Sequence, residues 1–394
     1  MKFSSAHSTT PSSEEALREV LNRIQEDFES TDPPDVAIFF ITHHHQPCFP
    51  ELGLRVKRSL NVQHLLGTTA ESVIEGTQEF ENQPVLALWA GWLPEVQIHP
   101  FRITCAQTDE GFSFTGIPQE LPSGSTSPPT FLLLPDPFTI PTQEMLKIFS
   151  QQFPGAVVTG GLASGGQAPG QNTLFLNGDT FQEGAIGIAI QGPIEIRTII
   201  SQGCRPIGRH WVVTQAKGNI LNGLGGKPPL ERLQEIFETL DPEELELVRS
   251  ALHIGLVTNE YQEDFDRGDF LIRNVIGVDP GDGSLLLSDL VRTGQTVQFQ
   301  VREPDSARED LLHLLNRDRS QWKTPPLGGL IFSCNGRGSR LFGDPNVDIS
   351  GVRSVTGNIP IAGFFAQGEI GPVGGENFIH GFTASVALFA PASS

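Results

Sequence analysis

Residues 330–343, LIFSCNGRGSRLFG, join a short apolar run to a turn rich in glycine. The apolar run is typical of a strand that is buried on both faces, because it has no polar member and ends at a turn. Cys334 and Asn335 follow where such a strand leaves its sheet. Since α/β folds place ligands beyond the carboxyl ends of their strands, we expect a site at this turn.

A second stretch, AQGEIGPVGGENF at 366–378, also places a glycine-rich loop directly after an apolar run. If the strands that end at Phe332 and Phe365 are neighbours, the two loops meet at one edge of a sheet. The sequence then predicts a pocket that holds one cation, Arg337, and one carboxylate, Glu369, which suits an amino acid or a similar zwitterion. The alternative is a salt bridge between these two residues that only ties the loops together.

Cys334 has two interpretations. A thiol beside the backbone N–H groups of a glycine turn can act as a nucleophile, with His380 as the candidate base. Cysteine is also among the most commonly buried residues, and we expect Cys334 to pack or to line the pocket rather than to catalyse. Asn335 and Asn377 are expected to orient the ligand. The predicted ligand-binding residues are Cys334, Asn335, Arg337, Glu369 and Asn377, and no catalytic residue is predicted.

Helices and strands are both predicted along the chain. Ser12 and Glu15 form a capping box that opens a helix, and DVAIFFIT at 35–42 is typical of a buried strand. Three stretches between 172 and 203 look like consecutive antiparallel strands, and 269–289 predicts a hairpin with a turn of Pro, Gly and Asp. The fold class is therefore α/β of mixed α+β type, with two domains of mixed sheets covered by helices.

The length of 394 residues exceeds what one core usually serves, so two domains are expected. The stretch NGLGGKPP at 222–229 is rich in Gly and Pro and breaks the pattern of strands before it. We place a polar tail and an N-terminal helix at 1–33, a first domain at 34–215 and a second domain at 216–394.

The formal net charge of −20 argues against nucleic acid or an anionic membrane as the partner, because binding to phosphates needs clustered Lys and Arg. An acidic surface leaves open a scaffold that recognises a basic protein. The longest apolar stretch, PVLALWAGWLP, is shorter than the ~20 residues of a membrane span. The amino terminus has no apolar signal segment and the four cysteines are widely spaced, which together favour the cytoplasm.

No cofactor and no metal is predicted. In an extended strand, only the first and third histidines of the run at 43–45 share a face, with Cys48 as the one other soft ligand nearby, so we expect a structural or pocket-lining role. NGLGGK does not match a phosphate loop, because Leu221 stands six positions before Lys227 where that motif has glycine.

These motifs together resemble a known family. HLLGTTAESVIEG, PVLALWAGWLP and VVTGGLASGG are similar to the amino-terminal FIST domain, whereas LIFSCNGRG and IAGFFAQGEIGPVGGENFIHGFT are similar to the carboxy-terminal FIST domain. The resemblance covers about residues 36–390. It implies a sensory or signal-transduction module that binds a small ligand, with amino acids as the favoured candidates, and it leaves room for a signalling-protein partner.

The resemblance is incomplete in the first domain. Where that domain has Gly-Cys-Ser or Gly-Cys-Thr, this sequence has Gly67, Thr68 and Thr69, so a thiol is missing, and Glu71 and Ser72 replace a later glycine. The motif residues of the second domain do match: Cys334, Gly336, Arg337, Gly338, Gly368, Glu369 and Gly371.

Overall fold

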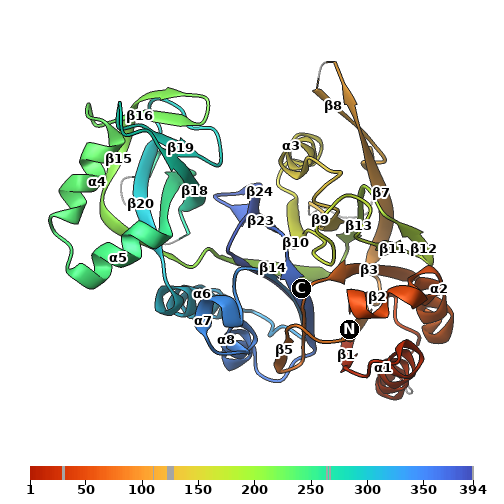
Figure 1. Ribbon diagram of the computed structural model, residues 1–394. Coiled ribbons are helices and arrows are strands. Elements are labelled where there is room, and N and C mark those ends of the chain that lie inside the picture. The colour runs from red at the N-terminus through yellow and green to blue at the C-terminus, as the bar shows by residue number, and fades with distance from the viewer. Residues whose placement is uncertain (29–31, 110, 122–127, 263–264, 266–267, 393–394) are drawn as a thin grey trace. The chain divides into compact units, whose positions relative to one another are not determined.

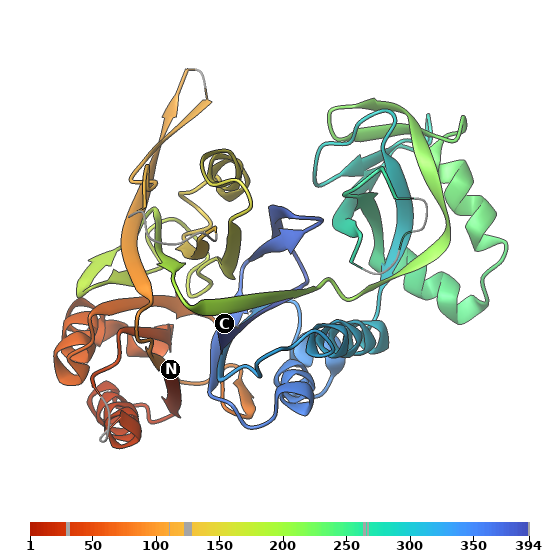
Figure 2. The same ribbon diagram turned by 180° about the vertical axis from the view of Figure 1, so that it is seen from behind.

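The computed structural model describes residues 1–28, 32–109, 111–121, 128–262, 265 and 268–392. The chain divides into two compact units, one made of residues 1–200 and 312–394 and the other of residues 201–311. Three sheets belong to the first unit and a closed barrel to the second, and both termini lie in the first unit (Figures 1 and 2). The predicted mixed α+β class is confirmed. The domain boundary that we place at 215 from the sequence stays a prediction.

The first sheet has the order β1-β6-β2-β3-β11-β12. Its strands are β1 (Lys2–Ser8), β6 (Leu86–Trp92), β2 (Val36–Thr42), β3 (His64–Ala70), β11 (Leu174–Leu176) and β12 (Asp179–Phe181). The segment that we expected to be a polar tail contains β1, which pairs antiparallel with β6. Sequence pattern missed it because Phe3 and Ala6 are its only apolar members, yet the Phe3 ring stacks on Trp89 with 4.8 Å between centroids.

The second sheet has the order β24-β23-β10-β9-β13-β7-β8. Its strands are β24 (Glu376–His380), β23 (Glu369–Val373), β10 (Val157–Gly161), β9 (Thr130–Pro135), β13 (Ala185–Gln191), β7 (Gln97–Thr108) and β8 (Gly111–Thr115). Five of these strands come from the amino-terminal half, whereas the hairpin β23–β24 comes from the end of the chain.

The third sheet has the order β14-β25-β21-β22-β4-β5. Its strands are β14 (Ile194–Ser201), β25 (Ala384–Pro391), β21 (Gly328–Cys334), β22 (Ile361–Ala366), β4 (Val73–Glu75) and β5 (Gln78–Phe80). β21 and β22 are parallel neighbours, with Cys334 opposite Ala366. The two glycine-rich loops that follow these strands therefore begin at the same edge of the sheet. The hairpin β4–β5 comes from the amino-terminal half and pairs with β22 from the carboxy-terminal half, so the third sheet, like the second, combines strands from both halves of the chain.

The expectation of consecutive antiparallel strands between 172 and 203 is wrong in its pairing. β11 pairs with β12 and β3, whereas β13 lies between β7 and β9, and β14 joins β25 in another sheet. Alternation and turn residues predict that strands exist, but they carry no information on which sheet buries each of them.

The second unit is a closed barrel with the order β15-β16-β19-β18-β17-β20. Its strands are β15 (Cys204–Lys217), β16 (Ile220–Leu224), β19 (Leu285–Leu287), β18 (Phe270–Val278), β17 (Leu252–Val257) and β20 (Thr296–Arg302). The hairpin predicted at 269–289 is confirmed as β18 and β19, which pair antiparallel.

The helices are α1 (Ser13–Phe28), α2 (Phe49–Leu60), α3 (Thr142–Gln152), α4 (Pro229–Phe237), α5 (Pro242–Ala251), α6 (Pro304–Arg319), α7 (Ser339–Phe342) and α8 (Val347–Thr356). The predicted helix after Ser12 is confirmed as α1, which lies with α2 beside the first sheet (Figure 1). The histidines at 43–45 open a 3₁₀ helix, η1 (His43–Cys48), and not the extended strand that we assumed, because β2 already ends at Thr42.

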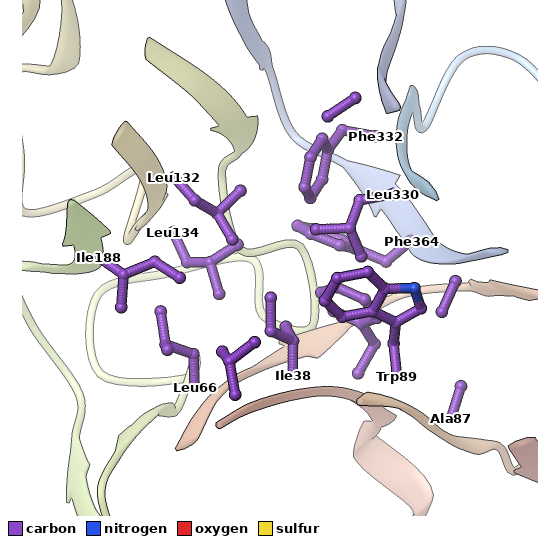
Figure 3. Close-up of a cluster of buried hydrophobic side chains, with 14 of the residues drawn as sticks. Ile38, Leu66, Ala87, Trp89, Leu132, Leu134, Ile188, Leu330, Phe332 and Phe364 are labelled. Atoms are coloured by element: carbon purple, nitrogen blue, oxygen red, sulfur yellow. The ribbon is translucent and has the colours of Figure 1, made fainter. Parts of the chain in front are cut away.

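The core of the first unit lies among the inner faces of its three sheets. Side chains from β2, β3 and β6 meet side chains from β9 and β13 and from β21 and β22 (Figure 3). The labelled members are Ile38, Leu66, Ala87, Trp89, Leu132, Leu134, Ile188, Leu330, Phe332 and Phe364. Because this cluster includes strands from both halves of the sequence, β3 and β21 share one core within the first unit.

Candidate functional site

The two glycine-rich loops predicted from sequence lie next to each other at the carboxyl ends of β21 and β22. The backbone N–H of Asn335 donates to the carbonyl of Ala366 at 3.0 Å. The N–H of Cys334 donates to the carbonyl of Thr383 at 2.9 Å, which adds the turn before β25 to the same place. Three segments that are far apart in sequence are therefore joined by backbone hydrogen bonds at this edge.

Arg337 is fully buried in an ion pair with Asp348, a residue that sequence analysis did not single out. The exposed fractions of the two side chains are 0% and 1%. Nε of Arg337 donates to Oδ2 of Asp348 at 2.8 Å and Nη2 donates to Oδ1 at 2.7 Å. Ser333 also donates its hydroxyl to Oδ2 at 2.5 Å. The bidentate geometry fixes the guanidinium inside the protein.

Glu369 is also buried, and it contacts the turn that Arg337 contacts. Its Oε2 accepts the backbone N–H of Thr383 at 3.0 Å, while Nη1 of Arg337 donates to the carbonyl of Phe382 at 3.4 Å. Phe382 has a φ of 62°, a left-handed conformation that is unusual for a bulky residue. The two charged residues therefore hold adjacent positions of one strained turn.

Cys334 and Asn335 are partly exposed at the same edge. The backbone N–H of Gly336 donates to Sγ of Cys334 at 3.4 Å. Oδ1 of Asn335 is hidden from solvent and has no hydrogen-bond partner within the described residues. Buried polar atoms in folded proteins nearly always have a partner, so this oxygen is available to a bound molecule or to water.

Arg340 and Glu71 form an exposed ion pair beside Asn335. Their side chains are 54% and 35% exposed. Nη1 of Arg340 donates to the backbone carbonyl of Asn335 at 3.0 Å. The hydrogen bond from Arg340 to Glu71 raises the pKa of Arg340, so its positive charge is secure. Neither residue was predicted as part of a site, and the one signal in the sequence was that Glu71 departs from the pattern of the first domain.

His380 and Asn377 have other surroundings. Nε2 of His380 lies 3.0 Å from the carbonyl of Gly371, and the side chain is buried. Oδ1 of Asn377 accepts the N–H of Val158 at 2.9 Å, and its Nδ2 donates to the carbonyl of Ala156 at 2.9 Å. These two hydrogen bonds connect β24 to the beginning of β10. Asn377 also borders a separate hollow of about 390 Å³ between α3 and the turn of β23–β24. Its amide is not brought to Arg337, and a role for it in ligand binding stays a prediction.

Comparison with known proteins decides the family. Residues 35–227 match the FIST N domain and residues 229–372 match the FIST C domain. The chain belongs to the FIST family. FIST domains form a sensory signal-transduction family. An uncharacterized protein of Mycobacterium tuberculosis (strain ATCC 25618 / H37Rv) is 38% identical over 99% of this chain and 100% of its own length. An uncharacterized protein of Mycobacterium bovis (strain ATCC BAA-935 / AF2122/97) is 36% identical, with 97% of each chain covered.

The FIST N domain also caps a helix of the FIST C domain. Glu79, on β5, accepts the backbone N–H groups of Ile349 and Asn346 at 3.0 Å each, which are donors at the amino end of α8. Burial, and then the nearby charge of Asp348, raise the pKa of Glu79 to about 7. The helix that carries the partner of Arg337 is therefore held by a carboxyl group that titrates near neutral pH.

A buried polar network supports the FIST N side of the edge. Oδ1 of Asn172 accepts the hydroxyl of Thr69 at 3.3 Å and the N–H of Gly166 at 2.8 Å, and its Nδ2 donates to Asp136 at 2.9 Å. Ser164 connects this region to the loop of Glu71, because its hydroxyl accepts the N–H of Glu71 at 3.0 Å. Thr69 lies within β3 (His64–Ala70), so its hydroxyl connects that strand to Asn172.

Within the described ranges, no helix combines the length and the apolar character that crossing a bilayer requires.

Proposed function

We propose that this FIST protein is a cytoplasmic sensory protein that binds a small ligand, an amino acid or a similar zwitterion, beside the loop that follows β21. The observation that carries the proposal is the exposed ion pair of Arg340 and Glu71. It presents one positive and one negative side chain, from FIST C and FIST N respectively, next to the amide of Asn335. A zwitterion matches this arrangement with its carboxylate on the arginine and its ammonium group on the glutamate.

Exchange of this ion pair for a ligand costs little. An exposed pair contributes about 0–1 kcal/mol, because water and salt screen the two charges. A ligand that takes both charges out of water keeps their attraction and can also donate a hydrogen bond to Oδ1 of Asn335. The polarisable sulfur of Cys334 offers a contact for the ligand's apolar part.

Arg337 and Glu369 have a different role in this proposal from the one that sequence predicts for them. Both are buried, and Arg337 is held on two sides by Asp348. Contact with a ligand would require breaking that pair, so we assign to Arg337 and Glu369 the task of positioning the turn at Phe382 and the loop of Cys334. Direct contact of these two residues with a ligand stays a prediction.

Ligand binding would change the connection between the two domains. In the free protein, Arg340 ties the FIST C loop directly to Glu71 of FIST N. A bound zwitterion replaces that direct contact with a bridge through itself. A signalling partner that recognises the loop would then distinguish the two states, which is the minimum that a sensor needs.

The test is a thermal-shift screen of the twenty amino acids, followed by calorimetric titration of the responding ones. We expect at least one to raise the unfolding temperature of the wild type, and we expect Arg340→Gln and Glu71→Gln to weaken its binding at least tenfold. Arg55→Gln breaks another exposed ion pair, with Glu14, and is the matched control. The proposal fails if no amino acid binds, or if Arg340→Gln binds as tightly as the wild type.

One observation favours a second function, that of a thiol-dependent enzyme. The N–H of Gly336 points at Sγ of Cys334, and backbone donors of this kind favour a thiolate. Alkylation by iodoacetamide, measured as rate against pH, tests it. An enzyme nucleophile is expected to react well below the ~8.5 at which an ordinary thiol titrates; titration at the ordinary value would contradict enzymatic use of this residue.

A further inference from the structure

The outer part of the second sheet is a two-stranded arm that ends in an edge strand. β13 pairs with β7 from Gln97 to Ile103, whereas β8 pairs with β7 from Thr104 to Thr108. β8 is the last strand of this sheet, so no other strand of the described chain pairs with its outer edge. The hairpin of β7 and β8 extends beyond the other strands of the sheet (Figures 1 and 2).

The arm has none of the features that usually protect an edge strand. Charged side chains, proline or a bulge commonly prevent such a strand from pairing with another chain. The stretches TCAQT at 104–108 and GFSFT at 111–115 contain no charged residue and no proline, and they pair in an unbroken register. All of β8 is exposed except the half-buried Phe114. Its outer edge therefore presents N–H and C=O groups with which another strand can pair.

The side chains of β8 are arranged symmetrically about Ser113. Phe112 and Phe114 share one face of the hairpin, because successive side chains of a strand alternate between its faces, and Phe112 is 49% exposed. If a second β8 pairs antiparallel with the first so that Ser113 lies opposite Ser113, each Phe112 lies directly opposite the Phe114 of the other strand. Aromatic pairs in this position stabilise a sheet. Neither strand places a charge in the contact.

We propose that the outer edge of β8 is a dimer interface, at which the second sheets of two copies of this chain join across a twofold axis at Ser113. A second copy is the occupant that fits, because the order Phe-Ser-Phe is its own complement in antiparallel pairing. Twofold symmetry also gives the closed arrangement that is commonest among homo-oligomers. A basic partner is disfavoured at this edge, since β8 has no acidic side chain. The proposed zwitterion site uses no residue of the arm.

The first test is sedimentation equilibrium of the full-length protein over a wide range of concentrations. We expect a reversible equilibrium between monomer and dimer. Phe112→Lys places a charge opposite the Phe114 of the second copy and should weaken the dimer at least tenfold, while circular dichroism should show an unchanged fold because Phe112 is half-exposed. Ile276→Lys alters another exposed apolar residue of a strand, 56% exposed on β18, and should associate as the wild type does.

Disulfide formation tests the register. In a parent chain that carries Cys105→Ser, Ser113→Cys places two thiols opposite each other at the twofold axis. Thr115→Cys is equally exposed, but it leaves the two thiols four residues apart along the strands, roughly 13 Å, which is beyond the ~7 Å between Cα atoms that a disulfide spans. We expect mild oxidation to give a covalent dimer of the Ser113→Cys chain, and none of the Thr115→Cys chain or of the parent.

Three results would overturn the proposal. A monomer at every concentration would mean that no second copy pairs with β8. A dimer that Phe112→Lys does not weaken would place the contact on another surface. Equal cross-linking of the two cysteine variants would exclude the register centred on Ser113. Loss of amino acid binding at Arg340 would change none of these measurements, so the two proposals fail separately.

Discussion

Arg337, in the turn after β21, and Arg340, in the short helix α7, stand three positions apart, yet their ion pairs differ in burial. The pair of Arg337 with Asp348 is 0% and 1% exposed, whereas that of Arg340 with Glu71 is 54% and 35% exposed. Charges that are withdrawn from water depend on each other, since either one alone would be buried without compensation. Charges that remain in water can separate at little cost. The first pair therefore supports the loop, and the second is suited to exchange with a ligand.

The largest effect is expected from Asp348→Asn, which leaves the buried guanidinium without its counter-charge. We expect a loss of about 3–5 kcal/mol in the free energy of unfolding, measured by urea denaturation. Glu14→Gln, which breaks an exposed pair with Arg55, should leave the free energy of unfolding nearly unchanged, because water screens both charges. An equally small effect of Asp348→Asn would remove the distinction between the two classes of pair.

The next largest effect on stability concerns Glu79, whose carboxyl group caps α8, the helix that contains Asp348. The pKa of Glu79 is about 7 in the folded protein against an ordinary 4.5. Between these values the folded state keeps a proton that the unfolded state has released, so this group's contribution to stability falls as the pH rises from 4.5 to about 7. The full difference is about 3 kcal/mol, at about 1.4 kcal/mol for each tenfold change in affinity for the proton.

Glu79→Gln isolates this contribution, because glutamine does not titrate and keeps one acceptor oxygen, enough for one of the two N–H groups of α8. The loss of the other hydrogen bond lowers stability by an amount that does not depend on pH. The free energy of unfolding of the variant minus that of the wild type should rise with pH up to about 7 and then level off. Urea denaturation at a series of pH values measures this difference. A difference that stays constant with pH would show that folding does not change the pKa of Glu79.

The strands that carry the loop could be predicted from sequence, whereas both ion pairs could not. The run that ends at Cys334 and the run that ends at Ala366 are apolar throughout and stop at glycine turns, which is enough to indicate buried neighbouring strands. Asp348 stands in α8, where Asn346 occupies the N-cap position but does not cap the helix with its side chain, because its Oδ1 accepts the backbone N–H of Glu79. The cap comes instead from the carboxyl group of Glu79 on another domain. A pattern in the neighbouring sequence cannot predict a capping residue that lies this far away along the chain.

Long-range pairing is the general reason for what sequence analysis missed. Glu71 and Arg340 are 269 positions apart, and they meet because the hairpin β4–β5 of FIST N pairs with β22 of FIST C. Periodicity shows that these segments are strands but not that they change sheets. The convergence of Cys334, Arg337 and Glu369 on one turn could be anticipated, because parallel neighbours must end at the same edge. The identity of the exposed charges at that edge could not.

The smallest effect on stability is expected from the exposed pair of Arg340 and Glu71. This pair also gives the sharpest test of the difference between exposed and buried ion pairs. A double-mutant cycle of Arg340→Gln and Glu71→Gln should give a coupling energy below about 1 kcal/mol that shrinks further as salt is added, since both charges are in water. A saturating zwitterion should abolish this coupling, because each side chain then interacts with the ligand and no longer with the other. A coupling of several kcal/mol, insensitive to salt, would mean that Arg340 supports the loop as Arg337 does and that no ligand could displace Glu71 from it.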